Sequence, residues 1–470
     1  MRISSGFNAD VMPGYAGTRR LDELRAAEYA HLDEHTYLDY TGSGVAAAAQ
    51  IRAHAERLAG HCYGNPHSEN PTSSASTALV ERARRAVLAF FNASPEEYAV
   101  VFTQNATGAC RLVGEAYPFG RGRRLVLTGD NHNSVNGIRE FARARGAEVA
   151  HVPVRGPGLR VREAELAAAL GGRGGLLAFP AQSNFSGVQH PLDWVGLAHA
   201  HGYDVLLDAA AFAPSNRLDL SRVRADFVPV SWYKVFGYPT GVGSLVARRE
   251  ALARLRRPWF AGGTIQAVSA LGGWHVLAPD ETAFEDGTLN FLSIPDVEFG
   301  VHWIEDVGID LVHRRVACLT SLLLRRLAVL RHADGSPLVR VYGPPDGDRR
   351  GGTVAFNVLD RRGAVVDERI VARDTAAAGI SVRTGCFCNP GAGEGAFEIP
   401  ERALRRTANL RTPALDDYLG VLGLPSGGAV RASLGLVSNV ADVERLAGFL
   451  DAAYADREPD RSGLRPRERC

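Results

Sequence analysis

Lys234 is the residue whose type and setting point most clearly to chemistry. It is the sole lysine among the 53 Lys and Arg residues, so arginine supplies every other basic side chain. A guanidinium provides charge and ion pairs, but it does not lose its proton and cannot act as a nucleophilic amine. Lys234 lies between Trp232-Tyr233 and Val235-Phe236, and apolar surroundings lower the pKa of an amine. These features predict Schiff-base chemistry at Lys234 rather than an incidental surface lysine.

Polar side chains stand near the ends of the predicted strands. Asp208 ends an apolar run, Asn184, His132 and Thr107 each follow one, and Ser231 lies three positions before the lysine. Ligands of open parallel sheets bind outside the carboxyl ends of the strands. Taken singly, each residue also fits a plainer role as a loop residue, helix cap or turn residue. Together, an amine, a carboxylate, a stacking ring and a hydroxyl at a helix N-terminus match the needs of pyridoxal phosphate.

The cysteines are too sparse for a disulfide framework and favour a reducing compartment. They are Cys62, Cys110, Cys318, Cys386, Cys388 and Cys470. Only Cys386 and Cys388 lie close together, and their CxC spacing does not match zinc motifs, so we expect no metal site. The glycines of segment 386–393 predict an exposed, mobile loop that carries a reactive thiol, and two buried small side chains are the alternative.

These side chains need a scaffold of alternating strands and helices. Apolar runs predict strands at 99–103, 124–128, 148–154, 175–180, 204–209, 226–233 and 242–247. Helical patterns cover 73–91, 107–117, 135–145 and 191–201. The alternation predicts an α/β domain over 36–290 around a mainly parallel seven-stranded sheet.

A second, smaller α+β domain is predicted over 291–455. A helical pattern over 295–331, broken near Gly308, precedes strands at 339–342, 353–359 and 381–384, with further helices at 364–378 and 440–453. We expect residues 1–35 to pack on this domain. The charged segment 456–470 is expected to be disordered, with Cys470 incidental.

The composition excludes several classes of protein. The chain has 470 residues, 46% of them hydrophobic, which is enough for a large core. Its 53 basic and 52 acidic residues nearly cancel, so neither nucleic acid nor an anionic membrane is an expected partner. We find no apolar run long enough to span a membrane and no signal-peptide pattern, so a cytoplasmic protein is expected.

Four motifs carry a family resemblance over about residues 36–452. They are Leu206–Ala211 (LLDAAA), Ser231–Gly241 (SWYKVFGYPTG), Arg383–Gly391 (RTGCFCNPG) and Gly428–Gly435 (GAVRASLG). The chain resembles the class V aminotransferases, and within them the cysteine-desulfurase-like domain of molybdenum cofactor sulfurases. The resemblance implies a pyridoxal-phosphate-dependent transferase of fold type I, a homodimer with sites at the interface, and conversion of L-cysteine to L-alanine.

The resemblance also implies a role for each site residue. Lys234 bonds the cofactor, Asp208 pairs with its pyridine nitrogen, His132 stacks on the ring, Asn184 faces the ring oxygen, Thr107 and Ser231 bind phosphate, Thr288 reaches the phosphate of the neighbouring subunit, Arg431 holds the substrate carboxylate, and Cys388 accepts sulfur as a persulfide. Cys386 is a weaker candidate that could relay the persulfide. Arg383 is a candidate for lowering the pKa of the Cys388 thiol.

Departures from the pattern leave alternatives open. Many cysteine desulfurases have histidine and glutamine where this chain has Tyr233 and Ala211. The sulfurases continue into a domain that holds the molybdenum cofactor, whereas this sequence stops at Cys470, so the sulfur acceptor is unassigned. The fold also serves C–S β-lyases, aminotransferases and epimerases, and a non-catalytic scaffold that keeps the cofactor is a further alternative.

Overall fold

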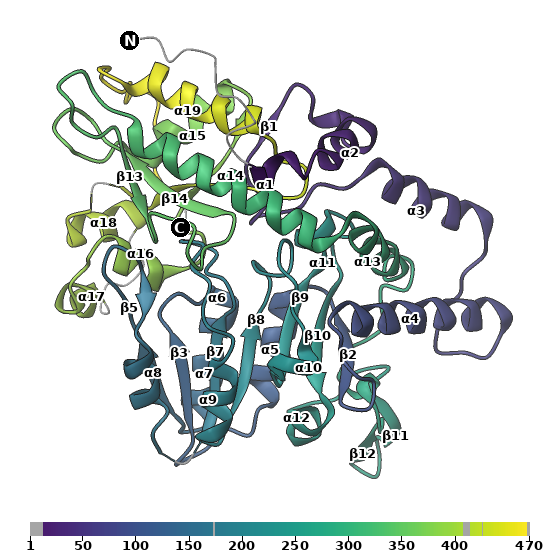
Figure 1. The fold of residues 1–470 in the computed structure, drawn as a ribbon. Helices are drawn as coiled ribbons and strands as arrows, with labels where there is room; N and C mark the ends of the chain where they lie inside the picture. Colours follow the sequence, from purple (N-terminus) through teal and green to yellow (C-terminus); the bar gives the residue numbers. More distant parts are fainter. Residues whose placement is uncertain (1–12, 173, 408–413, 425, 468–470) are drawn as a thin grey trace.

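A seven-stranded sheet forms the centre of the larger domain in the computed structural model, which describes residues 13–172, 174–407, 414–424 and 426–467 (Figure 1). Across the sheet the strand order is β2-β10-β9-β8-β7-β3-β4, and β10 alone runs antiparallel to its neighbours. The strands are β2 (Tyr98–Thr103), β3 (Arg124–Thr128), β4 (Glu148–Val152), β7 (Gly175–Pro180), β8 (Tyr203–Asp208), β9 (Phe227–Ser231) and β10 (Gly243–Arg248). The predicted mainly parallel sheet is confirmed.

Both faces of this sheet are buried. In β3, Leu125 and Leu127 pack with α5 (Ala106–Ala116) and α7 (Ile138–Ala144), whereas Val126 packs in a second cluster with α4 (Pro71–Phe90) and α9 (Trp194–Ala200). Successive strand side chains point to opposite faces, so a strand covered on both sides is apolar throughout. These continuous apolar runs are why the strands could be predicted from the sequence.

The smaller domain is built on an antiparallel sheet with the order β13-β14-β17-β16. Its strands are β13 (Val339–Tyr342), β14 (Thr353–Val358), β16 (Arg383–Gly385) and β17 (Ala429–Ser433), and its long helices are α14 (Ile309–Val329), α15 (Glu368–Ala377) and α19 (Val440–Tyr454). Helix α13 (Pro295–Val307) ends at Gly308, whose φ of +92° favours glycine. The predicted helix break therefore lies at this residue. Figure 1 shows α14 crossing the molecule above the large sheet.

The N-terminal segment is attached to the smaller domain. Arg315 of α14 is completely buried, and its two terminal nitrogens each lie 2.8 Å from a carboxylate oxygen of Asp22 in α2 (Arg20–Glu28). Strand β1 (Thr36–Tyr37) then pairs in parallel with β15 (Ile380–Ser381). Asp39 follows shortly after β1, so these contacts place it at the boundary of the two domains.

Other elements differ from the sequence-based expectation. The helix expected at 135–145 is divided into α6 (Asn133–Asn136) and α7, and the strand expected at 381–384 is divided into β15 and β16. A hairpin of β11 (Ile265–Ser269) and β12 (Trp274–Leu277), which was not predicted, projects from the lower right of Figure 1. The remaining elements are α1 (Pro13–Ala16), η2 (Ala30–Leu32), α3 (Ala48–Gly60), β5 (Val154–Arg155), β6 (Arg160–Val161), α8 (Glu163–Ala169), α10 (Leu220–Val223), α11 (Trp232–Phe236), α12 (Arg249–Arg254), η3 (Glu281–Phe284), α16 (Pro390–Ala396), α17 (Glu401–Thr407) and α18 (Leu415–Leu422).

The C-terminal segment 456–467 has no helix or strand, yet it makes specific contacts. Arg467 donates hydrogen bonds to Glu368 at the start of α15 and to Asp416 of α18. Cys470 lies outside the described residues. Over the part of the chain that the structure describes, no helix is both long and apolar enough to cross a membrane.

Candidate active site

A cavity of about 410 Å³ brings the sequence-predicted residues together at the carboxyl ends of the parallel strands. Among the residues that line it are Thr107, His132, Asn184, Asp208, Ser231 and Lys234. Gln104, Ser134, Gln182, Tyr233 and Thr240 also line it and were not predicted to be site residues. Chain segments far apart in sequence therefore converge on one site, as the strand-end rule for open sheets predicts.

Lys234 lies on a short helix that begins where the predicted strand, expected to continue to Tyr233, has already ended. Strand β9 ends at Ser231, and α11 runs from Trp232 to Phe236 before Gly237, whose φ of +82° ends it. Trp232 and Phe236 are buried and stacked, with ring centroids 5.7 Å apart. Residues four apart share one face of a helix, so the lysine between them lies away from this apolar face and lines the cavity.

The electrostatic setting of Lys234 favours the neutral amine. Burial lowers its pKa, Asp208 opposes that shift, and the nearby Arg431 and Arg383 lower the pKa further. Asp208 ends β8, and its Oδ1 accepts a hydrogen bond of 3.0 Å from the backbone N–H of Ala210. The cavity thus pairs a carboxylate with a primary amine that loses its proton more easily than an exposed lysine.

His132 enters the cavity as a neutral ring. Its Nδ1 accepts a hydrogen bond of 3.1 Å from the backbone N–H of Ser134, so the neutral ring carries its proton on Nε2. Burial and the Lys234 amine both lower the pKa of His132, and Asp208 partly opposes them. A neutral imidazole lining the cavity is suited to stacking on an aromatic cofactor.

The N-terminus of α5 supplies donors for an anion. Asn105 caps this helix by accepting from the N–H of Gly108 at 2.9 Å, and the Thr107 and Ser134 hydroxyls lie 2.7 Å apart. A Cβ on Gly243 would lie 2.5 Å from the carbonyl carbon of Asn105, so glycine permits β10 to approach this loop. Hydroxyls and the backbone N–H groups of a helix N-terminus form a suitable phosphate site.

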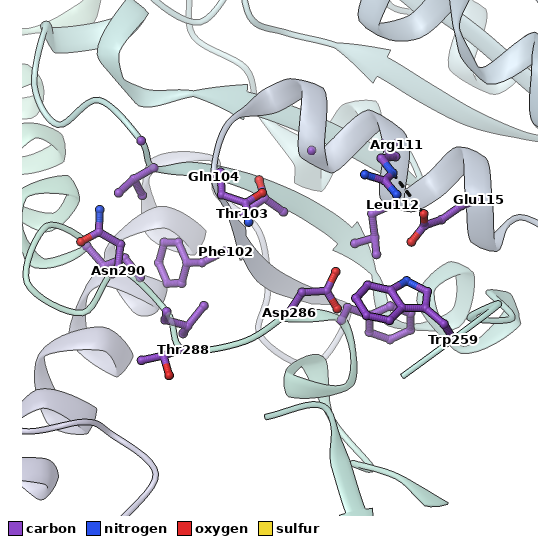
Figure 2. Close-up of a pocket in the computed structure, with 16 residues that line it drawn as sticks. Phe102, Thr103, Gln104, Arg111, Leu112, Glu115, Trp259, Asp286, Thr288 and Asn290 are labelled. Carbon is purple, nitrogen blue, oxygen red and sulfur yellow. Dashed lines mark ion pairs between the residues drawn. The ribbon is translucent and has the colours of Figure 1, made fainter. Parts of the chain in front are cut away.

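Thr288 lies apart from the other predicted residues. It lines a neighbouring cavity of about 280 Å³, which shares Gln104 and Gly241 with the first cavity. Figure 2 shows Thr288 and Asn290 at one end of this second cavity and the Arg111–Glu115 ion pair near the other. The structure of the single chain therefore does not bring Thr288 to Lys234.

Cys388 is exposed on a loop that is hydrogen-bonded to a residue lining the first cavity. Asn184 donates from Nδ2 to the carbonyl of Phe387 at 2.8 Å, and the N–H of Asn133 donates to the carbonyl of Cys388 at 2.7 Å. Phe387 and Cys388 have φ values of +57° and +52°, a left-handed conformation that costs non-glycine residues energy. Cys386 is disulfide-bonded, which we had not expected, so it could relay sulfur only after reduction.

Asn389 anchors the same loop, whose mobility had been expected from its glycines. It is fully buried and donates to the carbonyl of Asp130 at 2.7 Å and to Oδ1 of Asn184 at 2.8 Å. Its own oxygen accepts from the N–H of Ala392 and caps α16. A Cβ on Gly391 would lie 2.1 Å from the carbonyl oxygen of Gly129. Gly391 therefore permits close packing, which is a different role from loop mobility.

Arg431, the expected carboxylate-binding residue, lies in β17 and is only 3% exposed. It donates to Asp39 at 2.9 Å and to the carbonyl of Asn184 at 3.0 Å. Arg383 also forms an ion pair with Asp39, at 2.6 Å. The partner of its positive charge is therefore this carboxylate and not the Cys388 thiol. Sequence reasoning missed Asp39 because its partners are 344 and 392 residues away. Asn389 could have been found, because Asn before Pro marks a helix start.

The residues present fit pyridoxal phosphate. Lys234 offers an amine with a lowered pKa, Asp208 a carboxylate, His132 a neutral ring, and the α5 terminus with Thr107 a phosphate site. Within the described ranges, no group of three or more His, Cys, Asp or Glu side chains could hold a metal ion.

Comparison with known proteins supports the same family. The family model for class-V aminotransferases matches residues 36–446. Molybdenum cofactor sulfurase of Bos taurus is 36% identical over 466 residues, covering 93% of this chain and 52% of that protein. The Arabidopsis thaliana protein of the same name is 33% identical over 489 residues, covering 95% and 60%. The chain thus spans between 52% and 60% of the length of these curated relatives.

Solved structures agree on the fold. A cysteine desulfurase from Thermococcus onnurineus NA1 superposes with a TM-score of 0.76 at 25% identity, covering 92% of this chain and 97% of that one. The cysteine desulfurase CsdA from Escherichia coli gives a TM-score of 0.73 at 22% identity, covering 92% and 98%. With the family model matched from the first strand to the last helix, the chain belongs to the class-V aminotransferase family.

Proposed function

We propose that this chain is a pyridoxal-phosphate-dependent cysteine desulfurase that converts L-cysteine to L-alanine and holds the sulfur on Cys388. The observation that carries the proposal is the hydrogen bond between Asn184, which lines the amine cavity, and the carbonyl of Phe387, next to Cys388. This bond keeps an exposed thiol beside a cavity built for an amino-acid amine. The cysteine desulfurases among the structural neighbours and the sulfurases among the relatives support the same chemistry.

The chain's own residues account for each step. Pyridoxal phosphate, when bound, supplies an electron sink for the substrate Cα. Nζ of Lys234, whose pKa is lowered by burial, takes the Cα proton. The Cys388 thiolate then attacks the substrate sulfur, and the C–S bond breaks with its electron pair left on the substrate carbon. Proton return gives alanine, and the sulfur stays on Cys388 as a persulfide, so the step needs no external oxidant or reductant.

A homodimer completes this proposal. Thr288 would reach the phosphate bound in the partner copy, because in its own chain it lines the neighbouring cavity instead. Exposed apolar side chains gather on the β11–β12 hairpin, including Leu271, Trp274 at 52% exposure and Val276 at 48%. Such a patch marks an interaction surface in a protein of this size. The contacts among the described residues assign no sulfur acceptor.

Product analysis with matched cysteine variants tests the function. The holoenzyme and its Cys388→Ala and Cys62→Ala variants would be given L-cysteine, and alanine, sulfide and pyruvate would be quantified. Cys62 is the control because it is also a free, exposed cysteine. We expect alanine formation to fall to background in Cys388→Ala alone. Pyruvate formation that is indifferent to Cys388 would make the enzyme a C–S β-lyase, and absence of both products from the native enzyme would reject L-cysteine as substrate.

A further inference from the structure

Asp39 joins two arginines beside the candidate active site. Its Oδ2 lies 2.6 Å from Nη2 and 2.9 Å from Nε of Arg383, and its Oδ1 lies 2.9 Å from Nη2 of Arg431. A backbone bridge to Ser433 fixes the position of Asp39. A Cβ on Gly42 would lie 2.5 Å from its Oδ2, so a larger residue there would displace the carboxylate. The backbone is thus shaped to hold this side chain against both guanidiniums.

The two arginines need an anion between them. Arg383 and Arg431 are direct cross-strand partners in β16 and β17, and like charges directly opposite each other destabilise a sheet. Arg431 is almost completely buried, where an unpaired charge is costly. Asp39 supplies one negative charge for two positive ones, so the cluster keeps a net positive charge that a second carboxylate would neutralise.

The guanidinium of Arg431 is held in place and keeps N–H donors that Asp39 and Asn184 do not use. One terminal nitrogen donates to Asp39 and the other to the carbonyl of Asn184 at 3.0 Å, while the Phe387 ring centroid lies 4.8 Å from the guanidinium carbon. Its Nε is buried and lacks a hydrogen-bond partner among the described residues. Arginine has five N–H donors, so the fixed group retains the capacity to bind a carboxylate.

We propose that Asp39 is the positioning residue that orients Arg431 for the carboxylate of the amino-acid substrate, and that it thereby makes the site select amino acids over simple amines. This inference rests on the proposed function. Arg383 binds Asp39 through three hydrogen bonds, whereas Arg431 uses one. An arriving carboxylate therefore shares Arg431 with Asp39 while Arg383 keeps Asp39 in place.

A pair of ligands that differ only by the carboxylate tests this role without turnover. L-alanine and ethylamine would be titrated into the pyridoxal-phosphate-loaded protein, with the visible absorption change as readout. Loss of this charge-assisted contact in Asp39→Asn should raise the apparent dissociation constant for L-alanine about tenfold and leave that for ethylamine within about twofold. Arg383→Gln should shift L-alanine binding in the same direction to a smaller extent. Asp334→Asn, at an exposed turn aspartate, should change neither.

The outcomes separate this inference from the proposed function. Equal weakening of both ligands in Asp39→Asn would show a merely structural role and overturn the inference, as would unchanged binding of both. If Asp39→Asn does not fold, selective weakening of L-alanine in Arg383→Gln supports the inference and its absence overturns it. A native protein that binds neither ligand while keeping its absorption band would overturn both the inference and the proposed function.

Discussion

The proposed bond to the cofactor can form at only one lysine, because the chain contains no second one. Borohydride reduction of the pyridoxal-phosphate-loaded protein should therefore label one peptide, the one containing Lys234. Lys234→Met should lose both the visible absorption band and the label, because its thioether cannot bond the cofactor. Lys234→Arg is the matched control that keeps a positive charge and should also lose both. A labelled peptide from the Lys234→Arg variant would contradict the assignment of the cofactor bond to Lys234.

The lowered pKa of Lys234 also predicts how the stability of the apoprotein depends on pH. Burial holds the folded pKa below the ordinary value of 10.5, so the unfolded chain binds the proton more tightly. The resulting destabilisation is fully present below the folded pKa and disappears as pH rises above 10.5. Lys234→Met apoprotein should therefore melt at a higher temperature than the native apoprotein at pH 7, and the difference should shrink toward pH 10.5. A difference that grows with pH would contradict this sign.

At the scale of elements, the sequence was most informative where strands are buried on both faces. Strands β3 and β7 have the predicted bounds because their apolar runs end sharply at polar or turn residues. The site residues at strand ends followed from these elements. Short strands such as β1 and β15 are stabilised by partners more than 300 residues away, so no local pattern reveals them. Asp39 was missed for the same reason.

Asn389 connects the elements that hold the proposed nucleophile, so Asn389→Ala should displace Cys388. The change removes the cap of α16 and leaves the Asp130 carbonyl without its donor, at a cost of about 1–3 kcal/mol in the free energy of unfolding. We expect faster alkylation of Cys388 by iodoacetamide and slower alanine formation, with the absorption band retained. Asn70→Ala removes the cap of α4 instead and should leave Cys388 unchanged. An equal effect of both variants would mean general destabilisation.

At the scale of the whole molecule, the site depends on how the two domains meet. The cavity residues come from the large domain, whereas Arg431 and the Cys388 loop come from the small one. The N-terminal segment is held on the small domain, because α2 packs on α14 through Arg315 and Asp39 then bonds both arginines. Movement of the small domain would therefore shift the Arg431 guanidinium and the Cys388 thiol together.

The proposed dimer can be tested on the β11–β12 hairpin. Val276→Asp places a charge on an exposed apolar strand, so the monomer should lose little stability while the dimer loses much, since burying an unpaired carboxylate is costly. We expect sedimentation to show a dimer of the 50.4 kDa chain for the native protein and a dissociation constant at least about a hundredfold higher for the variant.

The same variant should also bind pyridoxal phosphate more weakly, because the phosphate loses Thr288 of the second copy. Val421→Asp is the control, since Val421 is similarly exposed at 56% but lies on α18, away from the hairpin. A Val276→Asp monomer that keeps full cofactor affinity would separate dimerisation from the site and leave Thr288 without a role in phosphate binding. Thr288→Val in the native dimer distinguishes the two effects, because it should weaken cofactor binding without changing the sedimentation of the protein.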